Sequence, residues 1–173
     1  MVCNPQRREA GIARNIFYLD SDPFEAATLQ CDRHVVKMIL ESAQLLSTAH
    51  HELGSSAPYK STHKNHPSAV WTRQSTKHYD WLYQHFIGLC GEYKARYNKV
   101  HKSFGTCAFT LDRPPQGLLD CGFVEPPQCM PDECKVPGDS VAAYKQYYAL
   151  KNEEWTKAGR PMTWKPIALE SAS

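Results

Sequence analysis

The sequence predicts a mainly α protein, a single-domain helical bundle with a long irregular Pro/Cys-rich loop. Three observations support this fold class. The 173 residues suit one domain, apolar residues recur at helical spacing in three segments, and residues 103–138 hold six prolines and four cysteines. A stretch of this kind is typical of a functional loop or a surface wrap. We expect the domain to span residues 15–173, preceded by a flexible basic arm at residues 1–14.

Capping residues predict where the helices begin. Asp22 is a preferred N-cap and precedes a proline, which is favoured at the first helical position, and Pro67 begins a later helix in the same way. Asp32 is the expected N-cap of the second helix, and Asp139 or Ser140 caps the last. Along the chain we expect a strand or extended segment at residues 15–19. Helices are expected over residues 23–29, 32–50, 67–97 and 139–159, and the helix over 67–97 is bent or split at Gly88 and Gly91. Irregular structure is expected over residues 51–66 and 103–138 and in the tail over 160–166.

Composition excludes several classes of protein. Hydrophobic residues make up 42% of the chain and charged residues 22%, which is ordinary for a globular protein and excludes collagen, coiled coil and whole-chain disorder. No run of about 18 apolar residues is present, so we expect no membrane-spanning helix. The polar N-terminus has no secretory signal, so the expected location is the cytoplasm, where thiols stay reduced. The seven cysteines are widely spaced, so we expect neither a disulfide framework nor a metal site, and no cofactor.

Positive charge is concentrated in one block of the sequence. The formal net charge is only +2, but residues 60–102 contain eight Lys/Arg and two acidic residues, together with five of the eight histidines. A local basic block in a nearly neutral chain indicates a surface that faces a polyanion. The alternative is a solvated helix face that only keeps the protein soluble.

A narrow polar stripe marks the predicted helix over residues 32–50. At 100° per residue, the polar side chains fall within an arc of about 80°, and most of the remaining surface is apolar. Such a stripe either lines a cleft or is the solvated face of an amphipathic helix with a Lys37–Glu41 pair. The residues of the stripe are His34, Lys37, Glu41, Gln44 and Thr48.

Glu41, His34 and Lys37 are the candidate catalytic residues of this stripe. Desolvation on an apolar helix raises the pKa of a carboxyl group, so Glu41 is a candidate general acid/base. Lys37 is expected either to orient a phosphate or, with a lowered pKa, to form a Schiff base with an opened sugar. His34 is expected to hydrogen-bond phosphate or substrate.

Two further groups are candidates for binding nucleic acid. Residues 62–71 place donors just before a predicted helix N-terminus, which favours phosphate binding, although they equally suit a capping loop. Aromatic side chains interleave with the bases and belong either to the core or to a base-stacking surface. A third group ends the basic helix, where cations also stabilise a helix C-terminus. The candidate residues are His63, Lys64, Asn65, His66, Trp71, Arg73, His101 and Lys102.

Residues 15–46 resemble the N-terminal part of the phage pyrimidine-dimer DNA glycosylases of the endonuclease V type. The shared element is Asp-x-His followed by Glu seven residues after the histidine, here Asp32, His34 and Glu41, preceded by a short apolar segment and a helix. The tail Arg160-Pro-Met-Thr-Trp164 resembles the Arg-Pro-Thr-Trp ending of that family. Small phage and bacterial proteins that begin with a Met-Asn-Ile-Phe-like segment look similar over most of the length.

The resemblance implies a DNA repair enzyme that kinks the strand or flips a pyrimidine out of duplex DNA. In that family an N-terminal α-amine attacks the sugar C1′, and a glutamate stabilises the sugar cation and assists strand cleavage. Glu41 is implied as that glutamate, and His34 as the histidine that contacts phosphate or substrate. Arg33 and Lys37 lie on the same helix, and Asn15 begins the apolar segment, so these are implied as substrate-binding candidates.

The position of the amine departs from the family pattern. The amine belongs at the start of the apolar segment, but fourteen residues precede Asn15 in this sequence, and removal of Met1 leaves the amine on Val2. Three alternatives remain open: the arm folds back, the natural start differs, or the chemistry uses no such amine. In the last case, a water activated by Glu41 gives a monofunctional glycosylase, whereas Lys37 as a Schiff-base former gives a lyase.

We therefore expect an enzyme: a DNA glycosylase, with or without AP-lyase activity, whose partner is duplex DNA with a flipped damaged or modified pyrimidine. Two alternatives remain. One is a phage transferase that modifies a pyrimidine or DNA base, and the other is a non-catalytic module that binds nucleic acid or a host protein. For a phage-encoded protein, the expected location is the cytoplasm of the bacterial host.

Overall fold

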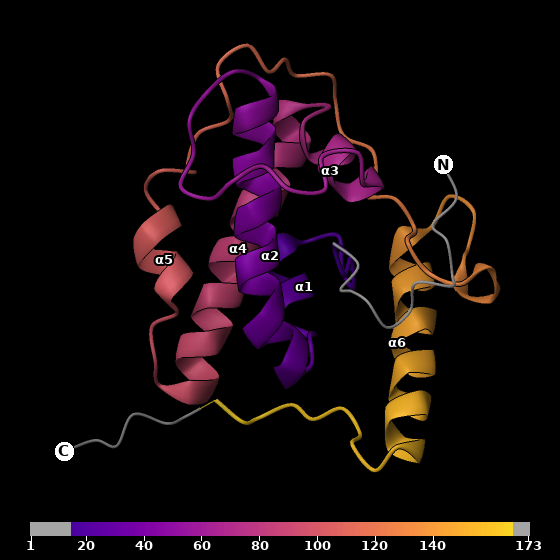
Figure 1. Cartoon of the computed structure of the whole chain (residues 1–173). Helices are drawn as coiled ribbons and strands as arrows, with labels where there is room; N and C mark the ends of the chain where they lie inside the picture. Colours follow the sequence, from indigo (N-terminus) through magenta and orange to yellow (C-terminus); the bar gives the residue numbers. More distant parts are fainter. Residues whose placement is uncertain (1–14, 168–173) are drawn as a thin grey trace.

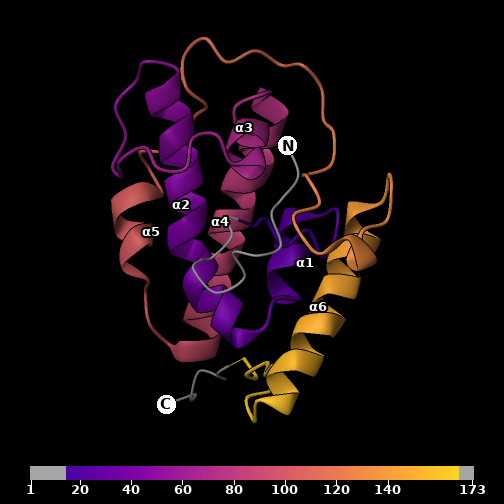
Figure 2. The same cartoon turned by 45° about the vertical axis from the view of Figure 1, so that its right-hand side comes forward.

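Two long helices, α2 (Asp32–Glu52) and α4 (Thr76–Tyr97), run alongside each other at the centre of the molecule. The computed structural model describes residues 15–167, so the arm expected at residues 1–14 lies outside the described residues. Helix α5 lies on one side of the central pair and α6 on the other (Figures 1 and 2). The remaining elements are α1 (Pro23–Thr28), α3 (Pro67–Thr72), α5 (Lys102–Cys107), the 3₁₀ helix η2 (Asp132–Cys134) and α6 (Ser140–Lys157).

Helices alone make up the regular structure of residues 15–167, which contain no β-strand, so the mainly α prediction is confirmed. A single hydrophobic core receives buried side chains from every helix of this part of the chain. None of these helices is long and apolar enough to cross a membrane.

Residues 15–19 form a buried extended segment. The ring of Phe17 stacks on that of His34 in α2, with 4.1 Å between centroids, and its edge meets the ring of Tyr148 in α6 at 5.5 Å. Because Phe17 contacts both helices, this segment packs between α6 and the central pair.

The predicted N-cap residues are correct for α1 and α6 but not for α2. Asp22 caps α1 by accepting hydrogen bonds from two backbone N–H groups, and Asp139 caps α6 by accepting one from the backbone N–H of Ala142. The prediction for Asp32 is wrong. Cys31 occupies the N-cap position of α2, and Asp32 is the first helical residue, because its carboxylate is engaged elsewhere as described below.

The helix predicted over residues 67–97 is divided, but not at its glycines. It breaks before Ser75, whose hydroxyl caps α4, while Gly88 and Gly91 lie inside α4. At Gly88 an added Cβ would lie 3.1 Å from the Cβ of Ala27, so the glycine permits the close crossing of α1 over α4. The expected break is therefore a site of helix packing.

The Pro/Cys-rich stretch over residues 103–138 begins with a helix, since α5 includes its first five residues. This part of the irregular prediction is wrong. Between α5 and α6 the chain forms turns and irregular segments with the single short helix η2. In Figure 1 this connection, coloured orange, passes over one end of the central pair before it reaches α6.

Candidate functional site

Burial divides the polar stripe of α2 into an inward part and an exposed edge. His34 and Glu41 are only 5% and 6% exposed, and seven residues of helix separate them by about 10 Å along the axis. Lys37 and Arg33 are exposed on the same half of the helix, and Gln44 is half-buried. The imidazole and the carboxyl group are therefore shielded from bulk water, while two cations remain at the surface beside them.

His34 is enclosed by aromatic side chains from two other segments. Its ring stacks on Phe17 and meets the edge of Trp155 at 5.5 Å. Its Nδ1 is hydrogen-bonded to the hydroxyl of Tyr148 at 2.7 Å. Burial lowers the pKa of His34 to about 3, and the positive charges of Lys151, Lys37 and Arg33 add to this effect. The ring is therefore neutral at physiological pH.

Three cations gather around this histidine where α2 meets α6. The guanidinium of Arg33 lies 4.1 Å from the ring centre of Trp155, and the Nζ of Lys151 lies 4.6 Å from that of Tyr147. Burial lowers the pKa of Lys151; Glu154 opposes the shift, and the charges of Lys37 and Arg33 reinforce it. No ion pair joins these three cations to an acid within residues 15–167. Such a cluster favours an anionic ligand.

Lys151 is the member of this cluster that the sequence analysis missed. It belongs to the last helix and to no recognisable motif. The readable signal was its spacing: it lies four residues after Tyr147 and four before Trp155, so an α-helix places all three on one face.

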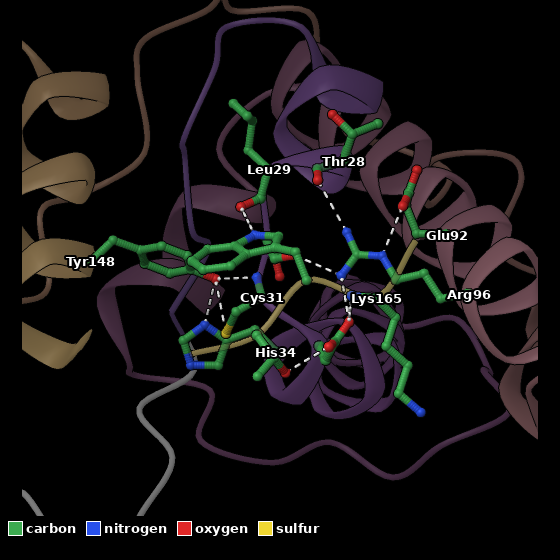
Figure 3. Close-up of polar contacts among 12 residues, drawn as sticks. Thr28, Leu29, Cys31, His34, Glu92, Arg96, Tyr148 and Lys165 are labelled. Atoms are coloured by element: carbon green, nitrogen blue, oxygen red, sulfur yellow. Dashed lines mark hydrogen bonds and ion pairs between the residues drawn. The ribbon is translucent and has the colours of Figure 1, made fainter. Parts of the chain in front are cut away.

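Asp32 ties the start of α2 to the C-terminal tail (Figure 3). Its carboxylate accepts hydrogen bonds from the backbone N–H of Lys165 at 2.9 Å and from the hydroxyl of Thr163 at 2.7 Å. The indole N–H of Trp164 donates to the carbonyl of Leu29 at 3.0 Å. The two elements that carry the sequence resemblance, Asp-x-His and Arg-Pro-Met-Thr-Trp, are therefore in direct contact.

Arg96 completes this cluster from α4. Its guanidinium forms ion pairs with Asp32 at 3.1 Å and with Glu92 at 3.0 Å, and it donates to two backbone carbonyls near the end of α1. Burial by itself would raise the pKa of Asp32, but the hydrogen bonds from the tail and from Arg96 outweigh burial and lower it. This buried network fixes the backbone two residues before His34. It also removes Arg96 from the basic surface expected over residues 60–102.

Two of the predicted DNA-binding histidines cap short helices. Nδ1 of His66 accepts a hydrogen bond from the backbone N–H of Ser68 at the start of α3, at 3.1 Å. Nδ1 of His101 accepts one from the backbone N–H of Ser103 at the start of α5, also at 3.1 Å. Both nitrogens thus bind backbone N–H groups. For His66 this is the capping alternative, whereas His101 was expected at the end of the basic helix and instead is the N-cap of α5. The exposed side chains beside them in sequence are His63, Lys64, Asn65 and Lys102.

The loop that contains His63 is attached to the far end of the α2 stripe. The hydroxyl of Thr48 accepts from the backbone N–H of Thr62 at 3.1 Å and donates to its carbonyl at 3.3 Å. Thr48 is fully buried. The structure therefore brings this loop to the helix that also carries His34 and Glu41.

The other predicted binding residues lie mostly inside the molecule. Trp71 is 3% exposed, stacks on His78 at 4.3 Å and donates its indole N–H to the carbonyl of Val124, so it packs in the core. Arg73 is half-buried at the C-cap of α3. Asn15 is 2% exposed, and its Oδ1 has no hydrogen-bond partner among residues 15–167.

Metal ligands are not grouped in the described part of the chain, where no three His, Cys, Asp or Glu side chains are placed to hold an ion. The junction of α2 and α6 instead offers a neutral imidazole and three cations, and the shielded carboxyl group of Glu41 lies about 10 Å farther along α2. This set of groups is suited to proton transfer and to binding a phosphate-containing substrate.

Comparison with known protein families identifies the family of this chain. A family model described as pyrimidine dimer DNA glycosylase matches residues 15–104. Comparison with curated proteins and with solved structures gave no match. The matched region, which exceeds half of the chain, runs from the buried segment at Asn15 through α5 and includes Asp32, His34 and Glu41. The chain therefore belongs to the pyrimidine dimer DNA glycosylase family, which implies that activity and a DNA substrate.

Proposed function

We propose that this chain removes a damaged or modified pyrimidine from duplex DNA, with Glu41 as the carboxylate that stabilises the sugar cation at C1′. The observation that supports this assignment is the position of Glu41. It lies in the region matched by the family model and is only 6% exposed, on the same side of α2 as His34. A carboxylate shielded from water stabilises a developing positive charge more strongly, because the effective dielectric constant is lower there.

The substrate-binding surface extends from this carboxylate in two directions along α2. Toward the N-terminal end, Arg33, Lys37 and Lys151 contact phosphates on either side of a flipped nucleotide. Toward the C-terminal end, the exposed His63 and Lys64 contact the backbone farther along the duplex. These assignments rest on exposure and charge.

Two chemical routes differ in the nucleophile. In the first, Glu41 accepts a proton from water while the water oxygen bonds to C1′ and the base leaves with the electrons of the glycosidic bond. In the second, the amine of Lys37 bonds to C1′ and the base leaves. The sugar ring then opens to an imine, which permits elimination of the 3′ phosphate.

Formation of abasic sites in ultraviolet-irradiated duplex DNA tests the assignment of Glu41. We expect Glu41→Gln to lower the rate about 10²–10⁴-fold, the range typical of a lost acid–base group. Glu133→Gln is the matched control, because Glu133 is exposed in η2 and is expected to keep the parent rate. A Glu41→Gln protein that is folded and as active as the control would exclude the proposed role.

Two further measurements separate the alternatives. Borohydride reduction traps the enzyme on DNA only if an amine forms an imine. A trapped adduct on Lys37 supports the second route, an adduct on the N-terminal amine supports the alternative in which the arm folds back, and the absence of any adduct supports the first route. Mass spectrometry of the nucleosides detects an altered pyrimidine that stays in the strand, which would contradict glycosylase activity and favour a transferase. Duplex binding without base release or alteration would favour a non-catalytic module.

A further inference from the structure

The hydroxyl of Tyr148 sits at the centre of a small buried network at the junction of α2 and α6 (Figure 3). It lies 2.7 Å from Nδ1 of His34, 3.1 Å from the backbone nitrogen of Cys31 and 3.6 Å from the sulfur of Cys31. The side chain belongs to α6, while both partners belong to the start of α2. This contact therefore joins the two helices at the histidine of the candidate site.

These contacts allow two positions for the ring proton of His34. The backbone N–H of Cys31 can only donate, so it uses one lone pair of the hydroxyl oxygen. In one arrangement the hydroxyl donates to Nδ1 and the ring proton lies on Nε2; in the other, Nδ1–H donates to the second lone pair and the hydroxyl donates to the Cys31 sulfur. A neutral imidazole nitrogen is a much stronger acceptor than a thiol sulfur at 3.6 Å, so the first arrangement gives the hydroxyl proton its better acceptor.

We propose that Tyr148 is a positioning residue that holds His34 as the Nε2–H tautomer, so that the ring presents one N–H donor to an anionic oxygen of bound nucleic acid. The proposal rests on the proposed function for its ligand, and on the structure alone for the tautomer. In Figure 3 the second ring nitrogen points away from the Tyr148 hydroxyl and makes no hydrogen bond drawn there.

The surroundings of the ring favour an anionic acceptor. The cations that face His34 are Arg33 and Lys37 from its own helix and Lys151 from α6. Each of them attracts an anion, whereas a neutral ring adds a directed donor without adding to their mutual repulsion. A phosphate group, with its negative charge and several acceptor oxygens, matches the charge and the donors of this set.

Packing alone does not account for this role of Tyr148. Phe17 stacks on the imidazole, and Trp155 meets its edge, so the plane of the ring is already fixed. Neither neighbour forms a hydrogen bond with the ring, so neither distinguishes one nitrogen from the other. Within residues 15–167, Tyr148 is the side chain that forms a hydrogen bond with the imidazole and can select its tautomer.

Nitrogen-15 NMR of the full chain tests the tautomer independently of activity. We expect His34 to show a protonated Nε2 and an unprotonated Nδ1 throughout pH 5–8, and we expect Tyr148→Phe to give a mixture of tautomers. Tyr97→Phe is the control, since it removes a phenolic hydroxyl that does not contact His34. A proton on Nδ1 in the parent protein would overturn the proposal even if glycosylase activity is found.

A double-mutant cycle on duplex binding tests the functional part. We expect His34→Gln to weaken binding of an undamaged duplex oligonucleotide about 10-fold, the loss expected for one directed hydrogen bond to a charged group. We expect Tyr148→Phe to weaken it about 2-fold, because about half of the molecules in an even mixture of tautomers lack the Nε2–H donor. In a His34→Gln background, Tyr148→Phe should cause no further loss, because its partner is already gone. Equal losses in both backgrounds would show a purely structural role. Correct tautomers with no binding or base release would refute the proposed function alone.

Discussion

Acidification should destabilise this protein well above the pH at which its carboxylates are protonated. The cause is the burial of neutral histidines. His34 has a pKa of about 3 in the folded chain, and burial lowers the pKa of His85 to about 4. In the unfolded chain both return to about 6.5. Below that pH the unfolded state binds protons that the folded state does not bind. The contribution of these histidines to the free energy of unfolding is therefore full above pH 6.5 and is lost as the pH falls.

The size of the loss follows from these pKa values. Between pH 8 and pH 5, His34 lowers the free energy of unfolding by ~2 kcal/mol and His85 lowers it by a similar ~2 kcal/mol. Asp32 adds little in this range. Its pKa is lowered in the folded state, so its contribution is lost only as the pH falls below about 4. A total of ~4 kcal/mol is a large share of the stability of an ordinary domain.

Urea unfolding followed by circular dichroism at pH 8 and pH 5 measures this loss. In His34→Phe the loss should be ~2 kcal/mol smaller than in the parent, because one titrating group is gone. The variant should also start ~1–3 kcal/mol lower at pH 8, since the Tyr148 hydroxyl loses its acceptor. Met38→Leu is the control: it changes a buried, non-titrating residue of α2 and should shift both values in parallel. Equal losses in parent and His34→Phe would refute the reasoning.

Two other variants test neighbouring parts of the structure. Asp32→Asn should lower the free energy of unfolding by ~1–3 kcal/mol, because Arg96 and the tail lose a charged acceptor while Glu92 still pairs with Arg96. It should also speed limited proteolysis of the tail; a tail as resistant as in the parent would contradict the contacts described. Lys151→Met should reduce the slope of log binding constant against log salt by about one, because one phosphate contact is removed; this is measured by fluorescence anisotropy of a labelled duplex, and an unchanged slope would place Lys151 outside the DNA interface.

Local signals were sufficient for much of the fold. The N-cap of α1 was readable because the Asp22 side chain acts on the adjacent turn, and the inward position of His34 and Glu41 was among the alternatives predicted by the polar stripe. The break before α4 was also readable, since Ser75 is a good N-cap, but the glycines farther along were weighted instead. The break predicted at Gly88 was wrong because the role of this glycine depends on Ala27, a residue of another helix.

Tertiary contacts account for what the sequence did not reveal. Asp32 is a preferred capping residue, yet its carboxylate binds Arg96 and a tail about 130 residues away, and no local pattern contains that information. For Trp71 and His66 the sequence left two roles open, DNA binding or a structural role. In the structure Trp71 packs in the core and His66 caps α3. Lys151 entered the candidate site only when α6 was placed beside α2.

The attachment of the tail to Asp32 has a practical consequence for truncation. The region matched by the family model ends at residue 104, and a fragment trimmed to that limit lacks α6 and the tail. Such a fragment would leave the Arg96–Asp32 pair open to water and would remove Tyr148 and Trp155 from around His34. Shortened versions of this protein should therefore be cut no earlier than Lys165, whose backbone amide is the last donor to the Asp32 carboxylate.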